Sequence, residues 1–333
     1  MALFRSDILN QEFFKKAVQS AERTSSVEIL ELTIGDSKTG LQVSIVYCLC
    51  CAICFHFIRC FQETAPVHIT AEVRGRRRDL CWSAKISPSS EAALALGKEL
   101  RLWEKEVFVY KELLPAIELR SNKLHLAAPA HADLVYADTE EEDHKALLFT
   151  DLGLAGFEPG SSGCGADPLT IELLVSTLAK LHAHGYDFMQ SSSDRSRDVL
   201  TDSVPLAGRR LASEEGLQEL LSSLDPPSPD YSSRLRSLFS TEAYFSMCRA
   251  VFGPRTDKLC VPCHGAPWLE NSLVWRDQAQ VREAVYVNYQ HARLCQPASD
   301  LCILLYTSTS KQFRREHVSN LLRGYHRLYL IQV

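Results

Sequence analysis

The sequence predicts an α+β protein whose first half is rich in strands and whose second half is mostly helical. Residues 27–35 and 67–73 alternate apolar and polar side chains with the period of a half-buried strand. Residues 168–188 instead repeat apolar side chains at three- and four-residue spacing, the pattern of an amphipathic helix. We therefore expect a strand-rich N-terminal lobe over 1–149 and a helical C-terminal lobe over 150–333.

The remaining elements of the first lobe follow from the same patterns. Residues 80–86 form a third strand-like run. Residues 91–115 have helical apolar spacing, and we expect that helix to stop at Pro115 because proline lacks an N–H donor. Residues 131–138 and 145–152 flank the acidic segment TEEEDH, so they predict a hairpin.

The second lobe begins after a segment rich in Gly, Ser and Pro, residues 153–168, which predicts a loop or linker. Beyond the helix predicted at 168–188, the sequence contains three short strand-like runs, at 258–263, 271–277 and 282–289, and then a closing helical region. The chain stops at the apolar segment 325–333, which we interpret as a truncation.

Residues 43–62, VSIVYCLCCAICFHFIRCFQ, do not fit the strand pattern around them. Their length just suffices for a bilayer span of about 20 residues, although His56 and Arg59 disfavour one. Gln42–Ser44 is what a splice-donor consensus encodes, and Phe61–Gln62 is what an acceptor encodes. Removing 43–62 keeps the reading frame. We favour a retained intron, with a membrane-spanning helix or a buried element as alternatives.

Charge and cysteine usage exclude several classes. A net charge of −5 does not support nucleic-acid binding, so we expect no nucleic-acid partner. We expect no membrane partner unless 43–62 is a genuine transmembrane helix. The first 22 residues predict an amphipathic helix without the apolar core of a signal peptide. The 12 cysteines form no regular framework, which favours cytosolic thiols and a cytoplasmic location.

Five motifs in order resemble one family of small-molecule phosphotransferases. The chain is similar to the ecdysteroid kinase-like, or choline-kinase-like (CHK), family, which is related to aminoglycoside phosphotransferases and has a bilobal protein-kinase-like fold. The motifs are WEKEVFVYKELLP, LLFTDLGLAGF, LAKLHA, HGAPWLEN and VNYQHARLCQPASDL. The resemblance implies ATP and Mg²⁺ as cofactors and a small hydroxylated molecule, such as an ecdysteroid, as acceptor.

The resemblance also implies roles for individual residues, since phosphoryl transfer depends on positioning and on charge at the phosphate oxygens. Lys85 would grip the α- and β-phosphates, and Glu106 would pair with Lys85. Asn271 would be a metal ligand. His264 would orient the catalytic loop by hydrogen bonding, although a hydrogen-bonded core histidine is the alternative.

Two positions depart from the family pattern. Ala266 stands where the family has the aspartate that accepts the substrate proton, and Asn288 stands where it has the aspartate that holds Mg²⁺. Glu270 is a candidate substitute base, and we expect Asp300 to be a helix cap or a loop anchor. We therefore predict a catalytically impaired, pseudokinase-like protein, with an active ATP-dependent kinase as the alternative. Whether the chain is an enzyme stays open.

The segment Cys260–His264 also matches C-x-x-C-H, the attachment signature of c-type haem. Haem attachment needs an oxidising export route, which the sequence does not indicate. A zinc pair is also disfavoured, because no second C-x-x-C or suitably spaced His/Cys pair follows. We expect Cys260 and Cys263 to be small core residues before the catalytic loop.

Overall fold

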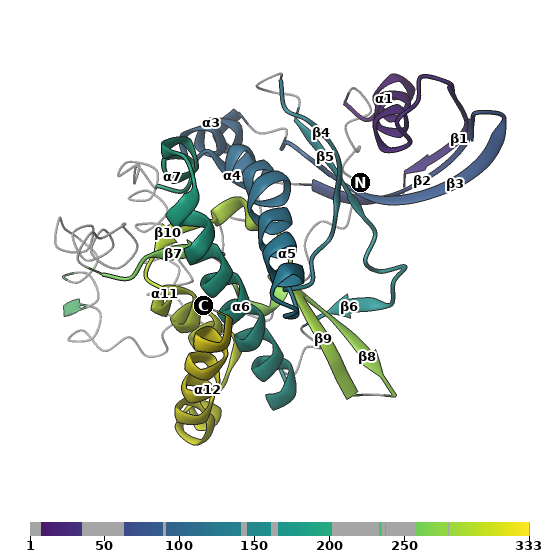
Figure 1. Ribbon diagram of the computed structural model, residues 1–333. Helices are drawn as coiled ribbons and strands as arrows, with labels where there is room; N and C mark the ends of the chain where they lie inside the picture. The colour runs from purple at the N-terminus through teal and green to yellow at the C-terminus, as the bar shows by residue number, and fades with distance from the viewer. Residues whose placement is uncertain are drawn as a thin grey trace. The chain divides into compact units, whose positions relative to one another are not determined.

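The computed structural model describes most of the chain and divides it into two compact units (Figure 1). The described residues are 8–34, 63–88, 91–140, 145–160, 166–201, 233–234, 237, 258–278 and 280–332. The first unit comprises Met1–Gln42, Arg59–Gly97 and Ala132–Gly156, and the second comprises Val43–Ile58, Lys98–His131 and Phe157–Val333. The division of the sequence between residues 149 and 150 remains a prediction.

The first unit is built on one antiparallel sheet of five strands, in the order β1-β2-β3-β5-β4. The strands are β1 (Val27–Ile34), β2 (Glu63–Val73), β3 (Arg76–Ile86), β4 (Leu134–Asp138) and β5 (Ala146–Thr150). The alternation in the sequence located β1 and β2, the strand-like run at 80–86 lies within β3, and the predicted hairpin is the pair β4 and β5. These predictions are confirmed.

Helix α1 (Gln11–Ala21) covers one face of this sheet, as Figure 1 shows beside β1 to β3. The side chain of Asn10 accepts a hydrogen bond from the backbone N–H of Phe13, which caps the helix. The apolar face of α1 packs against the apolar residues of β2 and β3 (Phe13, Phe14, Ala17, Val18, Val67, Ile69, Trp82 and Ala84). The opposite face of these strands is therefore left to polar side chains.

The single helix predicted over 91–115 is wrong in two respects. The chain forms α3 (Glu91–Glu99), α4 (Leu102–Phe108), a π-helical turn η1 (Val109–Leu113) and α5 (Leu114–Lys123). Arg101 interrupts the helix with a left-handed φ of 54°, and its guanidinium binds Glu104 and the Asp198 backbone carbonyl. Pro115 does not end the helix. The π-helical turn before Pro115 changes the backbone hydrogen-bond pattern of the helix. Pro115 then lies in the first turn of α5, where a backbone N–H is not needed.

The second unit contains two small antiparallel sheets, β6-β8-β9 and β10-β7. Their strands are β6 (Phe157–Pro159), β7 (Val261–Cys263), β8 (Ser272–Asp277), β9 (Gln280–Tyr286) and β10 (Arg293–Cys295). The three predicted strand-like runs are confirmed as β7, β8 and β9. The segment 153–168 is not all loop, because Phe157 to Pro159 pair with β8 as an edge strand.

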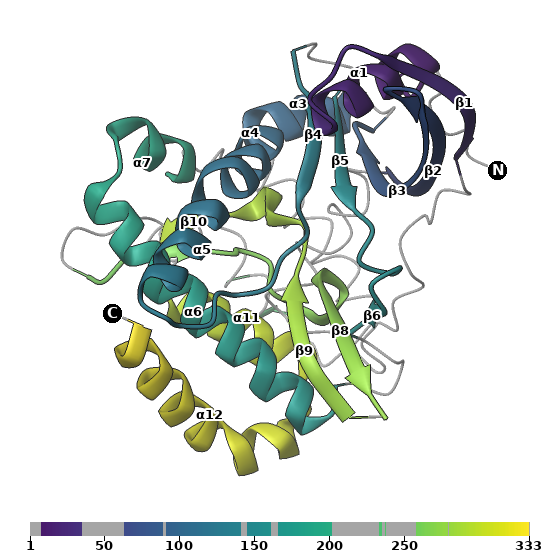
Figure 2. The ribbon, with the colours of Figure 1, turned by 45° about the vertical axis from the view of Figure 1, so that its right-hand side comes forward.

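Besides α4 and α5, the second unit contains the described helices α6 (Pro168–Ser191), α7 (Asp194–Leu200), α11 (Ala298–Ser308) and α12 (Lys311–Gln332). The Asp167 side chain caps α6 by accepting from the backbone N–H of Thr170. Helix α12 runs beside α6, as Figure 2 shows, and the Tyr325 hydroxyl hydrogen-bonds with His182. The predicted helix 168–188 and the closing helical region are confirmed.

Residues 43–62 lie outside the described residues, so the three interpretations of that segment stay open. Among the residues that the structure does describe, no helix combines the length and hydropathy that crossing a bilayer requires.

Candidate active site

The predicted catalytic loop joins β7 to β8 and begins with a glycine that cannot be replaced easily. Gly265 has a φ of +84°, a conformation that side chains disfavour. A Cβ at this position would overlap the backbone carbonyl of His291. The close approach of the two backbones therefore requires the glycine of the His-Gly pair in the motif.

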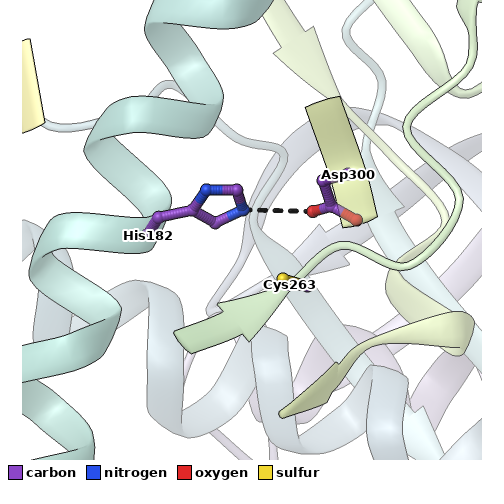
Figure 3. A group of neighbouring side chains, drawn as sticks. All are labelled: His182, Cys263 and Asp300. Atoms are coloured by element: carbon purple, nitrogen blue, oxygen red, sulfur yellow. Dashed lines mark hydrogen bonds and ion pairs between the residues drawn. The ribbon is translucent and has the colours of Figure 1, made fainter. Parts of the chain in front are cut away.

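A buried carboxylate holds the start of this loop. Asp300, in the first turn of α11, accepts hydrogen bonds from the backbone N–H groups of His264 at 2.6 Å and Gly265 at 3.0 Å. Nε2 of His182 on α6 lies 3.1 Å from Oδ2 of the same carboxylate (Figure 3). Asp300 is fully buried, so this set of bonds replaces its lost hydration. The prediction that Asp300 anchors the loop is confirmed.

The pKa of Asp300 shows how the anchor is stabilised. Burial alone would raise the pKa of this carboxyl, but the hydrogen bond from His182 and the other groups around it lower it below its ordinary value. The carboxylate therefore stays ionised inside the protein. The hydroxyl of Tyr325 contacts Nδ1 of His182 at 2.8 Å, so the ring is held from both sides.

Cys263 completes a buried group with His182 and Asp300, whose ligand atoms all lie within 4.8 Å of one another (Figure 3). These residue types match those of metal sites. Each member already has hydrogen-bond partners, and the Cys263 thiol donates to the backbone carbonyl of Cys295 at 3.6 Å. Burial raises the pKa of this thiol, which keeps it protonated. We therefore describe the group as the loop anchor, and Cys263 is a buried core residue as predicted.

His264 orients the loop from within. Its Nδ1 accepts a hydrogen bond from the backbone N–H of Ala266 at 3.2 Å, and its Nε2 donates to the carbonyl of Val287 at 3.0 Å. These partners require a neutral ring that carries its proton on Nε2. Burial lowers the pKa of His264 to about 4, in agreement with that neutral state.

The three positions that the resemblance predicts to hold the base and the metal ligands form one chain of neutral hydrogen bonds. The amide nitrogen of Asn288 donates to Oδ1 of Asn271 at 2.9 Å. Nδ2 of Asn271 donates in turn to the backbone carbonyl of Ala266 at 3.0 Å. Ala266 and Asn271 are buried, and Asn288 adopts a left-handed φ of 66° directly before the short helix η3 (Tyr289–His291). The structure thus brings together three of the residues that the motif indicated.

Magnesium does not fit this arrangement. The two side chains that would ligate it are neutral amides, whereas Mg²⁺ favours carboxylate oxygens. The Asn271 oxygen already accepts a hydrogen bond from Asn288. A bound ion would have to break that bond without gaining a negative ligand from either residue.

Aromatic rings connect the loop to the helix that contains the π-helical turn. The ring of Tyr289 lies 4.5 Å from that of His264 and 5.4 Å from that of Tyr110, measured between centroids. Burial raises the pKa of the Tyr110 hydroxyl, which also forms a hydrogen bond with the backbone of Asn288. Tyr110 and Tyr289 both lie within quoted motifs, but nothing in their spacing indicated that they touch.

Arg293 supports the loop from β10. Its Nη2 donates to the backbone carbonyl of Gly265 at 2.7 Å, and the residue is buried. Nothing in its spacing predicted this role. The available signal was a charged residue within the motif VNYQHARLCQPASDL, between Asn288 and Asp300.

Lys85 and Glu106 lie in different units. Lys85 lies on β3, opposite Thr64 and Leu147, and is 3% exposed. Glu106 lies on α4 and is 1% exposed. Their ion pair stays a prediction because each belongs to a separate compact unit. Glu270, on the short helix η2 (Leu269–Asn271), is half-buried, and its role as a base also stays a prediction.

Comparisons with known proteins identify one matching family. The model of the ecdysteroid kinase-like family matches residues 64–330. No curated protein matches. The GDP and kanamycin complex of APH(2'')-IIia is similar with 13% identity and a TM-score of 0.43, covering 95% of this chain and 87% of that one. A thermostable mutant of aminoglycoside phosphotransferase APH(4)-Ia, bound to ADP and hygromycin B, is similar with 10% identity and a TM-score of 0.38, covering 96% of this chain and 87% of that one. The family assignment depends on the family match alone.

Proposed function

The chain belongs to the ecdysteroid kinase-like family, and we propose that within it this protein is catalytically impaired. It would bind a small hydroxylated molecule and transfer phosphate to it poorly or not at all, as a pseudokinase does. The observation that carries this proposal is the chain of neutral hydrogen bonds from Asn288 through Asn271 to Ala266.

The first loss is that of the general base. In the family's pattern an aspartate at position 266 accepts the proton of the acceptor hydroxyl as phosphate is transferred. The methyl group of Ala266 can neither accept a proton nor orient a hydroxyl. Loss of a general base typically costs about 10²- to 10⁴-fold in rate.

The second loss is that of negative charge at the metal position. Asn288 donates a hydrogen bond through its amide nitrogen, which an aspartate at this position could not do. The amide pair therefore supports an arrangement that is stable without a metal ion. Weakened Mg²⁺ binding would lower the rate further, because the ion neutralises charge on the phosphates in such reactions.

Other parts of the site favour continued ligand binding. The loop keeps its glycine, its orienting histidine and its buried anchor, so its backbone is held in place. Lys85 keeps the residue type that would grip the phosphates of ATP, and Glu106 keeps the type that would pair with Lys85. We propose that the protein binds ATP in this way and that it is cytoplasmic. The same two residues, with Asn271, favour the second candidate function, an active ATP-dependent kinase that uses Glu270 as its base.

The proposal is tested by restoring the two aspartates in the full chain. Ala266→Asp combined with Asn288→Asp should raise Mg²⁺-dependent transfer of phosphate from ATP to a panel of hydroxylated sterols by at least about 10²-fold. The single changes should each do much less, because base and metal serve one transition state.

Lys85→Ala in the repaired protein is the control and should abolish the restored transfer. ATP-dependent thermal shifts of all variants report whether nucleotide binds. If the unaltered protein transfers phosphate as fast as the repaired one, the impairment is refuted and Glu270 becomes the leading base. If the repaired protein binds ATP yet stays inactive, the two substitutions are not the cause of impairment.

A further inference from the structure

A row of three reactive side chains crosses the first-unit sheet on the face opposite helix α1. The strand register places Thr33 of β1 opposite His68 of β2, and His68 opposite Cys81 of β3. Side chains alternate along a strand, so Cys81 and Lys85 share this face, whereas Trp82 and Ala84 belong to the apolar core. The row shares this face with Lys85, but it contains none of the residues on which the function proposed above depends.

The imidazole and the thiol of the row are in direct contact. Nδ1 of His68 lies 3.0 Å from Sγ of Cys81, so the thiol can donate its proton to the ring. His68 is exposed and Cys81 is partly exposed. The pair is therefore reachable by small molecules from solvent.

The contact lies in a hollow of the sheet. The hollow has a volume of about 260 Å³, which suits a small molecule, and side chains of all three strands line it (Glu31, Thr33, His68, Thr70, Asp79 and Cys81). Thr70 donates to the carboxylate of Asp79 at 2.7 Å, and Arg77 pairs with the same carboxylate at 3.7 Å. The two carboxylates of the hollow, Glu31 and Asp79, disfavour anionic ligands.

We propose that Cys81 is a modification site for small uncharged electrophiles of the α,β-unsaturated carbonyl class, with His68 as its base. A thiol that has passed its proton to a neighbouring imidazole is a thiolate, and the thiolate is the nucleophilic form of cysteine. The hollow supplies the room for the electrophile beside the sulfur.

The reaction is an addition and needs no further reactant. Cys81 passes its proton to Nδ1 of His68, and its sulfur forms a bond to the β-carbon of the electrophile. The π-electron pair of the carbon–carbon double bond moves toward the carbonyl group. The proton on His68 then returns to the α-carbon, which leaves a neutral thioether and a neutral imidazole.

Cys302 provides an internal control for accessibility. It lies on α11, is an exposed residue, and partial burial of its thiol raises its pKa. If exposure alone governed reactivity, Cys302 would react before the less exposed Cys81. The proposal predicts the reverse order.

The experiment is a timed labelling of the full chain with N-ethylmaleimide near neutral pH, followed by peptide mass mapping of every cysteine. Cys81 should be labelled about tenfold faster than Cys302. This comparison uses the unaltered protein, so it does not depend on the folding of any variant. His68→Asn should reduce the labelling of Cys81 to about the rate of Cys302. His317→Asn, at a partly exposed histidine of α12, should leave both rates unchanged.

Labelling of Cys81 at or below the rate of Cys302 would overturn the proposal. So would a Cys81 rate that is the same in the unaltered protein and in His68→Asn. Circular dichroism of the variants checks that they remain folded, and a slower Cys81 in a folded His68→Asn chain supports the role of the histidine.

Discussion

The buried anchor of the loop and the two positions at 266 and 288 that the family pattern predicts to react differ in the charge that they hold. The anchor keeps an ionised carboxylate, Asp300, and surrounds it with His182 and two backbone N–H groups. Ala266 and Asn288, which the family pattern predicts to be reacting positions, are neutral groups. The carboxylate of the anchor accepts hydrogen bonds from His182 and the loop backbone, whereas Asn288 and Ala266 are linked by hydrogen bonds through Asn271.

This difference teaches that the shape of the loop and its chemistry are physically separable. The backbone path is set by Gly265, His264 and Asp300, none of which needs an aspartate at 266 or 288 to form its contacts. Changes that remove charge from the reacting positions therefore leave the path intact. Changes to the anchor should instead disturb folding.

The largest effect is expected from breaking the anchor. Asp300→Ala leaves the N–H groups of His264 and Gly265 and the ring of His182 without their acceptor. Loss of one member of a buried, hydrogen-bonded pair typically costs about 3–5 kcal/mol. Urea denaturation should show this loss of stability. Asp277→Ala, at an exposed residue of β8, is the control and should change stability by less than about 0.5 kcal/mol; similar losses for both variants would contradict the anchor role.

A smaller effect is expected from titrating His264. Burial lowers its folded-state pKa to about 4 from an ordinary 6.5, so below pH 6.5 the unfolded chain binds a proton that the folded chain does not. The stability that it contributes is complete above pH 6.5 and is lost as the pH falls toward 4, by up to about 3 kcal/mol. Denaturation measured across this range should show the slope.

The control for that slope is His264→Gln, which removes the titrating ring. The variant should be less stable at neutral pH, but its stability should fall less steeply between pH 6.5 and 4. Equal slopes in the two proteins would mean that the histidine is not buried in its neutral form.

The smallest effect is expected at the reacting positions. Asn288→Asp replaces the amide nitrogen that donates to Asn271 with a second acceptor oxygen, so it should lower stability by about 1 kcal/mol in EDTA. Mg²⁺ should restore the loss, because the new carboxylate is a suitable ligand for the ion. Thermal unfolding with EDTA and with Mg²⁺ measures both effects.

Asn320→Asp on α12 is the matched control. Its Oδ1 accepts from Arg323 at an exposed site, and an aspartate keeps that acceptor. Its melting temperature should not respond to Mg²⁺. If Asn288→Asp and Asn320→Asp respond to Mg²⁺ alike, position 288 is not next to a latent metal site.

Local patterns were enough to predict much of the fold. The period of two located β1 and β2, because alternate residues of these strands face the α1 core. The three- and four-residue spacing located α6 for the same reason. Where one face of a helix or strand is buried and the other is exposed, apolar residues recur in the sequence with the period of that element.

Motif order also identified the loop and the residues Ala266, Asn271 and Asn288, which the structure brings together. It missed the π-helical turn before Pro115, and it missed the break at Arg101 because that break involves a contact outside the helix. Arg101, for example, is held by the backbone of Asp198 in α7.

Residue order identified the family of the protein and predicted that Ala266 and Asn288 stand where that family has carboxylates. Only the tertiary structure showed how these two positions are connected: a chain of amide hydrogen bonds runs from Asn288 through Asn271 to Ala266, beside an anchor built by His182 and Asp300 from two different helices. Residues 118 positions apart carry no local signal of their contact. Whether such groups face one another is decided by how α6 and α11 pack, and that packing depends on the shape of the whole core.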